Sequence, residues 1–176
     1  MAKSGLNENI ISKYEFYDPS FSSLMQKRIR RILLICSNYE AFLLEEDGRI
    51  DEQLFNEYAS QNLRFPPSFT FANTASKAFE ILKSETIDLV IEMLNIGDSD
   101  PFELAKKIKH CNPGLPIVVL THFSRETLLK VENEDLSAID YIFCWLGNPD
   151  LLLAIVKLLE DRMNLEHDVK QAGVQL

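Results

Sequence analysis

The stretch IDLVIEMLNIGDSDPFEL, residues 87–104, decides the fold because it joins a strand to a helix through a short loop. Residues 87–94 form an apolar run typical of strands that are buried on both faces of a parallel sheet. Asp100 stands where a helix N-cap is expected and Pro101 at the first helical position, which predicts a helix over 101–110. The stretch therefore reads as one strand-loop-helix unit of an α/β fold.

The same alternation of strand and helix runs along the rest of the chain. Further apolar runs of strand length lie at 32–36, 68–72, 116–121 and 138–145. Helical spacing of apolar residues occurs at 51–63, 74–83, 124–131 and 148–163. Strands that alternate with helices predict right-handed crossovers and a parallel sheet covered by helices on both faces.

Two of these helices have a clear predicted buried face. The helix over 51–63 carries Leu54, Phe55, Tyr58 and Leu63 on that face. The helix over 148–163, with Asn148 as its cap and Pro149 after it, carries Leu151, Leu152, Ile155, Leu158 and Leu159.

The chain divides into a main domain and two end regions. Residues 1–28 form an N-terminal extension rich in large apolar side chains, which we expect to pack on this domain or on a neighbour. The main domain spans 29–165, and the long connection between its first two strands predicts an elongated first helix or an added surface element. Residues 166–176 form a C-terminal helical extension or the start of a linker to a further domain, so we expect a fragment of a larger protein.

Composition narrows the classes of function. The chain has 176 residues and a net charge of −9, which argues against direct nucleic acid binding. It has no apolar run of membrane-spanning length and no signal peptide, so we expect a cytoplasmic protein that does not enter a membrane. Cys36, Cys111 and Cys144 lack metal-ligand spacing, which fits a reducing compartment. No nucleotide-binding or nucleophile motif occurs, and we expect neither an enzyme nor a bound cofactor or metal.

The opening stretch resembles the third strand and following loop of CheY-like receiver domains of two-component systems. Their pattern, roughly D-L-V-I-x-D-x-x-M-P-x-M-D-G-F-E-L, aligns without a gap. The matching residues are Asp88, Leu89, Val90, Asp100, Phe102, Glu103 and Leu104. The resemblance covers about 31–163 and implies a flavodoxin-like, doubly wound sheet of five parallel strands in the order 2-1-3-4-5.

The resemblance also implies where the phosphoryl-transfer residues of such a domain would stand, and most are replaced. The phosphoacceptor column falls on Met93, whose thioether cannot attack phosphorus. The two acidic residues that hold Mg²⁺ correspond to Cys36 and Ser37, and the lysine corresponds to Cys144. The sequence therefore predicts a degenerate phosphorylation pocket.

Two family positions are retained, and nearby acids leave an alternative open. Thr121 matches the hydroxyl residue that contacts the phosphoryl group, and Tyr141 matches the aromatic residue that couples to it in the family's conformational switch. Glu92, Asp98 and Asp100 are the alternative acceptors, although Asp100 is better explained as a helix cap and Glu92 would need a one-residue change of strand register.

The resulting hypothesis is a non-phosphorylatable pseudo-receiver, a regulatory interaction module in signal transduction. We expect it to act on a protein partner or a covalently linked downstream domain through its fourth and fifth helical surfaces or its last helix. A homodimer is a further option. The phrases LEEDGRIDEQ and ENEDLSAIDYIFCWLG also resemble the receiver-like N-terminal region of bacterial phosphoenolpyruvate synthase or pyruvate, phosphate dikinase-type proteins.

Two other functions stay open at this point. One is an atypical phosphorelay response regulator that uses another acidic acceptor. The other is a flavodoxin-like domain that binds a small molecule in the crevice near Cys36, Thr121 and Cys144.

Overall fold

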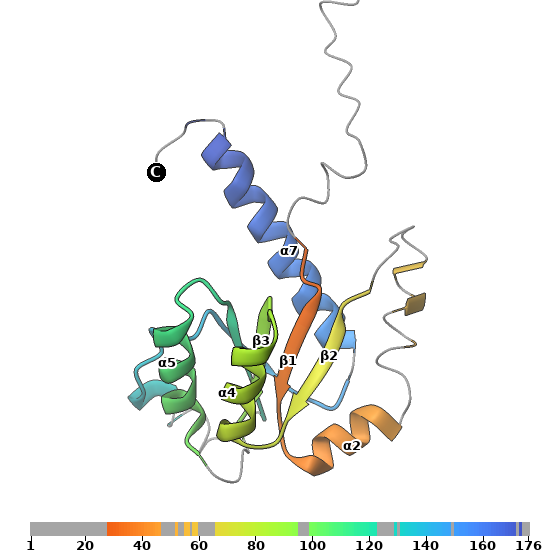
Figure 1. Cartoon of the computed structure of the whole chain (residues 1–176), viewed down its shortest axis with the longest axis vertical. Helices are drawn as coiled ribbons and strands as arrows, with labels where there is room; N and C mark the ends of the chain where they lie inside the picture. Colours follow the sequence, from red (N-terminus) through yellow and green to blue (C-terminus); the bar gives the residue numbers. More distant parts are fainter. Residues whose placement is uncertain are drawn as a thin grey trace, which may run out of the picture.

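Five parallel strands form one sheet in a computed structural model of the chain (Figure 1). The structure describes residues 28–46, 52, 55–56, 58–59, 66–94, 99–122, 129, 131–148, 150–171 and 173. The strands are β1 (Arg31–Ile35), β2 (Ser68–Ala72), β3 (Leu89–Met93), β4 (Ile117–Thr121) and β5 (Tyr141–Cys144). Their order is β2-β1-β3-β4-β5, and every neighbouring pair is parallel. The predicted flavodoxin-like topology is therefore confirmed.

Helices cover both faces of the sheet. They are α2 (Asn38–Glu46), α4 (Ala75–Ser84), α5 (Pro101–Cys111) and α7 (Asp150–Gln171). Figure 1 shows α4 and α5 on one face, and α7 crosses the other. Such two-sided cover requires strands that are apolar on both sides, which explains why β3 and β4 are buried along their whole length.

The period of two along each strand sorts the core into two layers. The layer under α4 and α5 contains Leu33, Ile35, Val90, Ile117, Ala78, Ile81, Leu104, Ala105 and Ile108. The layer under α7 and α2 contains Ile32, Leu34, Ile91, Met93, Val118, Leu120, Leu44, Leu152, Ile155, Val156 and Leu159.

The start of α5 follows the sequence prediction. The Asp100 side chain accepts hydrogen bonds from the backbone N–H groups of Phe102 and Glu103, at 2.9 and 3.3 Å. Pro101, at the first helical position, has no N–H that would need a partner. The predicted N-cap is therefore confirmed, and it fixes the entry of α5 beside the carboxyl end of β3.

Two side chains predicted to be buried are exposed. Leu158 of α7 is 43% exposed, while its neighbour Leu159 is 3% exposed. Successive helical residues are about 100° apart, so the helix that buries Leu159 turns Leu158 toward its outer side. In the region predicted as a helix over 51–63, Phe55 is 60% exposed and Tyr58 is buried.

Other predicted segments lie wholly or partly outside the described residues. These are the N-terminal extension up to residue 27, Leu54 and Leu63, and most of the predicted helix over 124–131. Helix α7 runs on from the predicted 148–163 segment to Gln171, so residues 166–171, predicted as a helical extension or the start of a linker, belong to the same helix. In the part of the chain that the structure describes, every helix is too short or too polar to span a bilayer.

Candidate functional site

The carboxyl ends of β1, β3, β4 and β5 meet at one edge of the sheet, called the carboxyl edge below. Ile35 pairs with Glu92 in the register of β1 and β3, so Cys36 and Met93 follow at the same level. Met93 pairs with Leu120. Thr121 then pairs with Cys144. The topology thus gathers the predicted site residues at the edge where open α/β sheets bind ligands.

Cys36 and Met93 both belong to the apolar core at this edge. Cys36 is 1% exposed and Met93 is 2% exposed, and they share a core layer with Trp145. The backbone N–H of Cys36 donates to the carbonyl of Ala72 at 3.0 Å, so β2 holds this end of β1 in place. The two positions offer a thiol and a thioether, neither of which is a hard oxygen donor.

Ser37 begins helix α2 through a reciprocal pair of hydrogen bonds with Glu40. The N–H of Glu40 donates to the Ser37 hydroxyl oxygen at 3.2 Å, and the N–H of Ser37 donates to Glu40 Oε2 at 3.1 Å. The Ser37 hydroxyl also donates to Glu40 Oε2 at 3.0 Å. This capping box satisfies backbone donors at the helix start, and it occupies both side chains.

Thr121 and Cys144 lie side by side at the ends of β4 and β5. The Thr121 hydroxyl donates to the carbonyl of His122 at 3.1 Å, and the side chain is largely buried. The N–H of Trp145 donates to the Thr121 carbonyl at 2.7 Å, which continues the pairing past Cys144. Cys144 and His122 are exposed, and Cys144 is a free thiol.

Tyr141 stands at the opposite end of β5 from Cys144. Its register partner is Val118, three residues before Thr121 on β4. The Tyr141 hydroxyl accepts a hydrogen bond from Arg162 Nη1 at 2.7 Å, and the Arg162 guanidinium lies 5.5 Å from the ring centre. The structure therefore joins Tyr141 to α7 and does not bring it together with Thr121.

The alternative acceptors have different surroundings. Glu92 is 0% exposed, and burial together with the nearby Asp100 carboxylate raises the pKa of Glu92 to about 9. Its carboxyl is therefore neutral at pH 7, which makes it a poor nucleophile. Asp100 caps α5 with its side chain. Asp98 lies outside the described residues.

These donors do not fit a magnesium ion. Mg²⁺ requires hard oxygen ligands and usually takes carboxylates. Cys36, Ser37 and Met93, which are predicted to correspond to the acid pair and acceptor of receiver domains, supply a buried thiol, a capping hydroxyl and a buried thioether. Among the residues described, no group of three or more His, Cys, Asp or Glu side chains could hold a metal ion.

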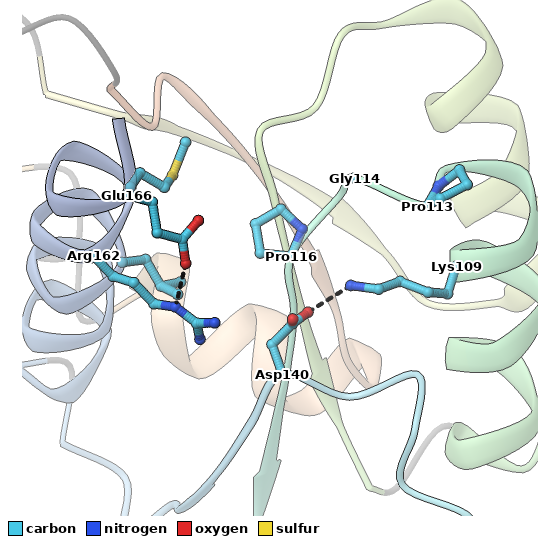
Figure 2. A pocket seen from close by; sticks show the side chains of 9 residues that line it. Lys109, Pro113, Gly114, Pro116, Asp140, Arg162 and Glu166 are labelled. Carbon is cyan, nitrogen blue, oxygen red and sulfur yellow. Dashed lines mark hydrogen bonds and ion pairs between the residues drawn. The ribbon is translucent and has the colours of Figure 1, made fainter. Parts of the chain in front are cut away.

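Two cavities lined by described residues open at the other edge of the sheet, where the strands begin. One, of about 250 Å³, lies between the end of α5, the starts of β4 and β5, and α7. Figure 2 shows Lys109 pointing toward Asp140 across it, with Arg162 and Glu166 on the α7 side. The Lys109–Asp140 and Arg162–Glu166 ion pairs measure 2.7 and 2.9 Å. A second cavity of about 620 Å³ continues along this edge toward Asp88.

Sequence reasoning missed two contacts that shape the site. The capping box has a local signature in the sequence, the S-x-x-E pattern of Ser37–Glu40. The contact between Tyr141 and Arg162 spans 21 positions and has no local signature.

Comparison with known proteins supports the fold. No family model matches the chain, and no curated protein matches it. A CheY-like response regulator receiver domain protein from Methanospirillum hungatei JF-1 has a TM-score of 0.57 and 22% identity, and the match covers 78% of this chain and 98% of that one. The response regulator TrrA from Thermotoga maritima, in complex with Mg²⁺ and BeF, has a TM-score of 0.52 and 22% identity. That match covers 74% of this chain and 99% of that one.

A two-component response regulator from Clostridium difficile gives a TM-score of 0.54 and 24% identity, over 77% of this chain and 98% of that one. At these identities the similarity concerns the backbone and not the chemistry of the site. The order of the strands, their parallel pairing and the helices on both faces all agree with these structures. The chain therefore has the flavodoxin-like fold of CheY-like receiver domains.

Proposed function

We propose that the chain is a pseudo-receiver, a regulatory domain of signal transduction that does not accept a phosphoryl group. The observation that carries this proposal is Met93, which stands in the phosphoacceptor column and is 2% exposed. A thioether in the apolar core has no oxygen to phosphorylate. The proposal includes the cytoplasmic location that the composition indicates.

The surrounding side chains support the same conclusion. Cys36 is buried, and Ser37 is engaged with Glu40, so no carboxylate replaces the family's acid pair at these two positions. Cys144, in the column of the lysine, carries no ammonium that could neutralise a phosphoryl oxygen. Charged side chains are thus replaced by neutral ones at the ends of β1, β3 and β5. Phosphoryl transfer depends on such charges to bind the metal ion and to stabilise the transferred group.

The output of such a domain would be a protein contact, and α7 supports this part of the proposal. Its outer side carries Leu158, Leu165 and Val169, which are 43, 65 and 37% exposed. Exposed apolar side chains along a long helix are suited to a partner protein, a linked domain or a second copy. Figure 1 shows α7 continuing past the edge of the sheet where the strands begin, and most side chains of its last turns are exposed.

An atypical phosphorelay has less support. The Glu92 carboxyl is inaccessible to a phosphodonor, and Asp100 already bonds the start of α5. The small-molecule alternative was placed near Cys36, Thr121 and Cys144, and the cavities beside Asp140 and Asp88 do not support it because they open at the opposite edge of the sheet.

Incubation of the protein with acetyl phosphate and Mg²⁺, followed by intact mass measurement, tests the proposal. We expect no added phosphoryl group, and we expect no chemical shift change when beryllofluoride and Mg²⁺ are added to labelled protein. The Thermotoga maritima domain, which forms a complex with Mg²⁺ and BeF, is the positive control. A stoichiometric phosphoryl adduct on this chain would exclude the pseudo-receiver.

A further inference from the structure

Glu92 is a carboxylic acid in the middle of the sheet. It belongs to β3, the central strand, where its register partners are Ile35 of β1 and Val119 of β4. The side chain is 0% exposed. Within the described part of the chain, neither carboxyl oxygen has a hydrogen-bond partner. A buried polar group without a partner is costly, so its presence calls for an explanation.

Among the described residues, the elements packed around Glu92 supply no cation to it. The alternation along β3 turns it toward the face covered by α4 and α5, whose contacts there are apolar. The charged group that acts on it is the carboxylate of Asp100, the N-cap of α5. The other charged residues of these helices point outward or bond elsewhere. Lys106 pairs with Glu103, and Lys109 pairs with Asp140. The charged side chains exposed on these two helices are Lys77, Glu80, Lys83, Glu103 and Lys107.

We propose that Glu92 is a proton-operated latch, whose protonated carboxyl keeps the end of β3 packed against the start of α5 and whose ionisation opens this part of the carboxyl edge. The step is the loss of one proton from the Glu92 carboxyl to water or hydroxide. It leaves a carboxylate between Ile35 and Val119, with the Asp100 carboxylate nearby.

The direction of opening follows from the position of Glu92 in its strand. Met93 is the last residue of β3, and the chain then leads to Asp100 and the first turn of α5. A carboxylate at Glu92 gains most by reaching water, and the end of the strand lies one residue away at Met93. The opposite direction leads through Val90 and Leu89, which are fully buried.

The latch lies one residue from the degenerate acceptor column but does not depend on it. Its proton would change access to the carboxyl edge whether or not the domain accepts a phosphoryl group. Failure of the phosphorylation experiment and failure of the latch are therefore distinguishable.

Carbon-13 NMR of the Glu side-chain carboxyls tests the protonation directly in the unmodified protein. We expect the Glu92 signal to titrate near pH 9, because burial and Asp100 both favour the neutral acid. Glu103 of α5, whose side chain is 57% exposed, supplies the reference signal of a carboxyl in contact with water. Titration of the Glu92 signal near its ordinary value of 4.5 would overturn the proposal.

Amide hydrogen exchange between pH 7 and 10, corrected for base catalysis, tests the opening. In the unmodified protein, the protection of amides in 90–94 and 102–105 should fall by roughly tenfold per pH unit above the Glu92 pKa. Glu92→Gln should keep these amides protected, and Glu103→Gln should behave like the unmodified protein. If Glu92→Gln does not fold, Glu92→Met replaces it. Equal loss of protection with and without the carboxyl would refute the latch.

Discussion

The side chains of Ser37 and Glu40 each accept the backbone N–H of the other, at 3.2 and 3.1 Å, where α2 begins. Ser37 is also the residue that the sequence comparison predicts to correspond to the second metal-binding acid of receiver domains. In the proposed pseudo-receiver this position would serve as a helix cap in place of a metal ligand, and both roles need an oxygen at the end of β1.

Ser37→Ala should lower the free energy of unfolding by about 1 kcal/mol, since it leaves the Glu40 N–H at the start of α2 without its acceptor. Urea unfolding at pH 7 measures the change. Ser37→Asp should recover only part of this loss, because aspartate caps a helix but would place its carboxylate beside that of Glu40, which the Ser37 hydroxyl bonds. The exposed Ser76→Ala in α4 controls for loss of a hydroxyl. Equal stability of Ser37→Ala and the unmodified protein would contradict the role of this cap.

Removal of the Tyr141 hydroxyl should loosen the link between β5 and α7. Arg162 bonds that hydroxyl through Nη1 and bonds Glu166 through Nε. The Arg162 side chain is 50% exposed, so we expect a coupling energy of only about 0.5 kcal/mol between the two residues. A double-mutant cycle of Tyr141→Phe and Arg162→Met measures it. A coupling of zero would mean that this contact does not connect β5 to α7.

Neighbouring leucines of α7 should respond very differently to truncation. Leu159→Ala should cost about 2–4 kcal/mol because the side chain is 3% exposed in the core layer. Leu158→Ala should cost less than about 1 kcal/mol, since that side chain is 43% exposed. Chemical unfolding of both variants gives the comparison. A larger loss for Leu158→Ala would mean that the helix turns its other side toward the sheet.

The fold could be predicted from the sequence because its signals are local and repeated. The five apolar runs and the Asp100–Pro101 helix start depend on neighbouring residues, and all five strands formed within three residues of their predicted limits. The exposure of Leu158 could not be predicted in this way. An amphipathic pattern gives the width of the apolar face, but contact with the sheet decides which of two adjacent leucines is covered.

The site was less predictable because its character depends on contacts between distant segments. From the order of strands and loops, the sequence identifies which chemical groups stand at the carboxyl edge. It does not reveal that Tyr141 bonds Arg162, nor that Glu92 lies between Ile35 and Val119 without a partner. Burial decides the protonation of Glu92, and burial is a property of the assembled sheet.

The stability of the protein should fall as pH rises above about 5. The Glu92 pKa is about 9 in the folded protein and has an ordinary value of 4.5, so the folded state binds the proton more tightly. The stabilisation that comes from this tighter binding of the Glu92 proton is complete below pH 4.5 and is lost progressively as the pH rises to 9. From pH 5 to pH 7 we expect a loss of about 3 kcal/mol.

Unfolding of Glu92→Met across the same pH range isolates this contribution. In this variant the free energy of unfolding should not fall between pH 5 and pH 7 through this group. At pH 7 it should be higher than in the unmodified protein. A slope that survives the substitution would have to come from other groups.

Acids introduced at the three aligned positions should create a metal site only when they are introduced together. Met93→Asp alone should destabilise the protein by roughly 3 kcal/mol or more, because it buries a carboxylate at a position that is 2% exposed. In the triple variant Cys36→Asp, Ser37→Asp and Met93→Asp, the end of β1 and the end of β3 would supply three carboxylates at one edge. Mg²⁺ binds such oxygens and binds only the folded state, so it should raise the melting temperature of the triple variant. A melting temperature that rises equally in the unmodified protein, or in no variant, would mean that Met93 does not occupy the acceptor column.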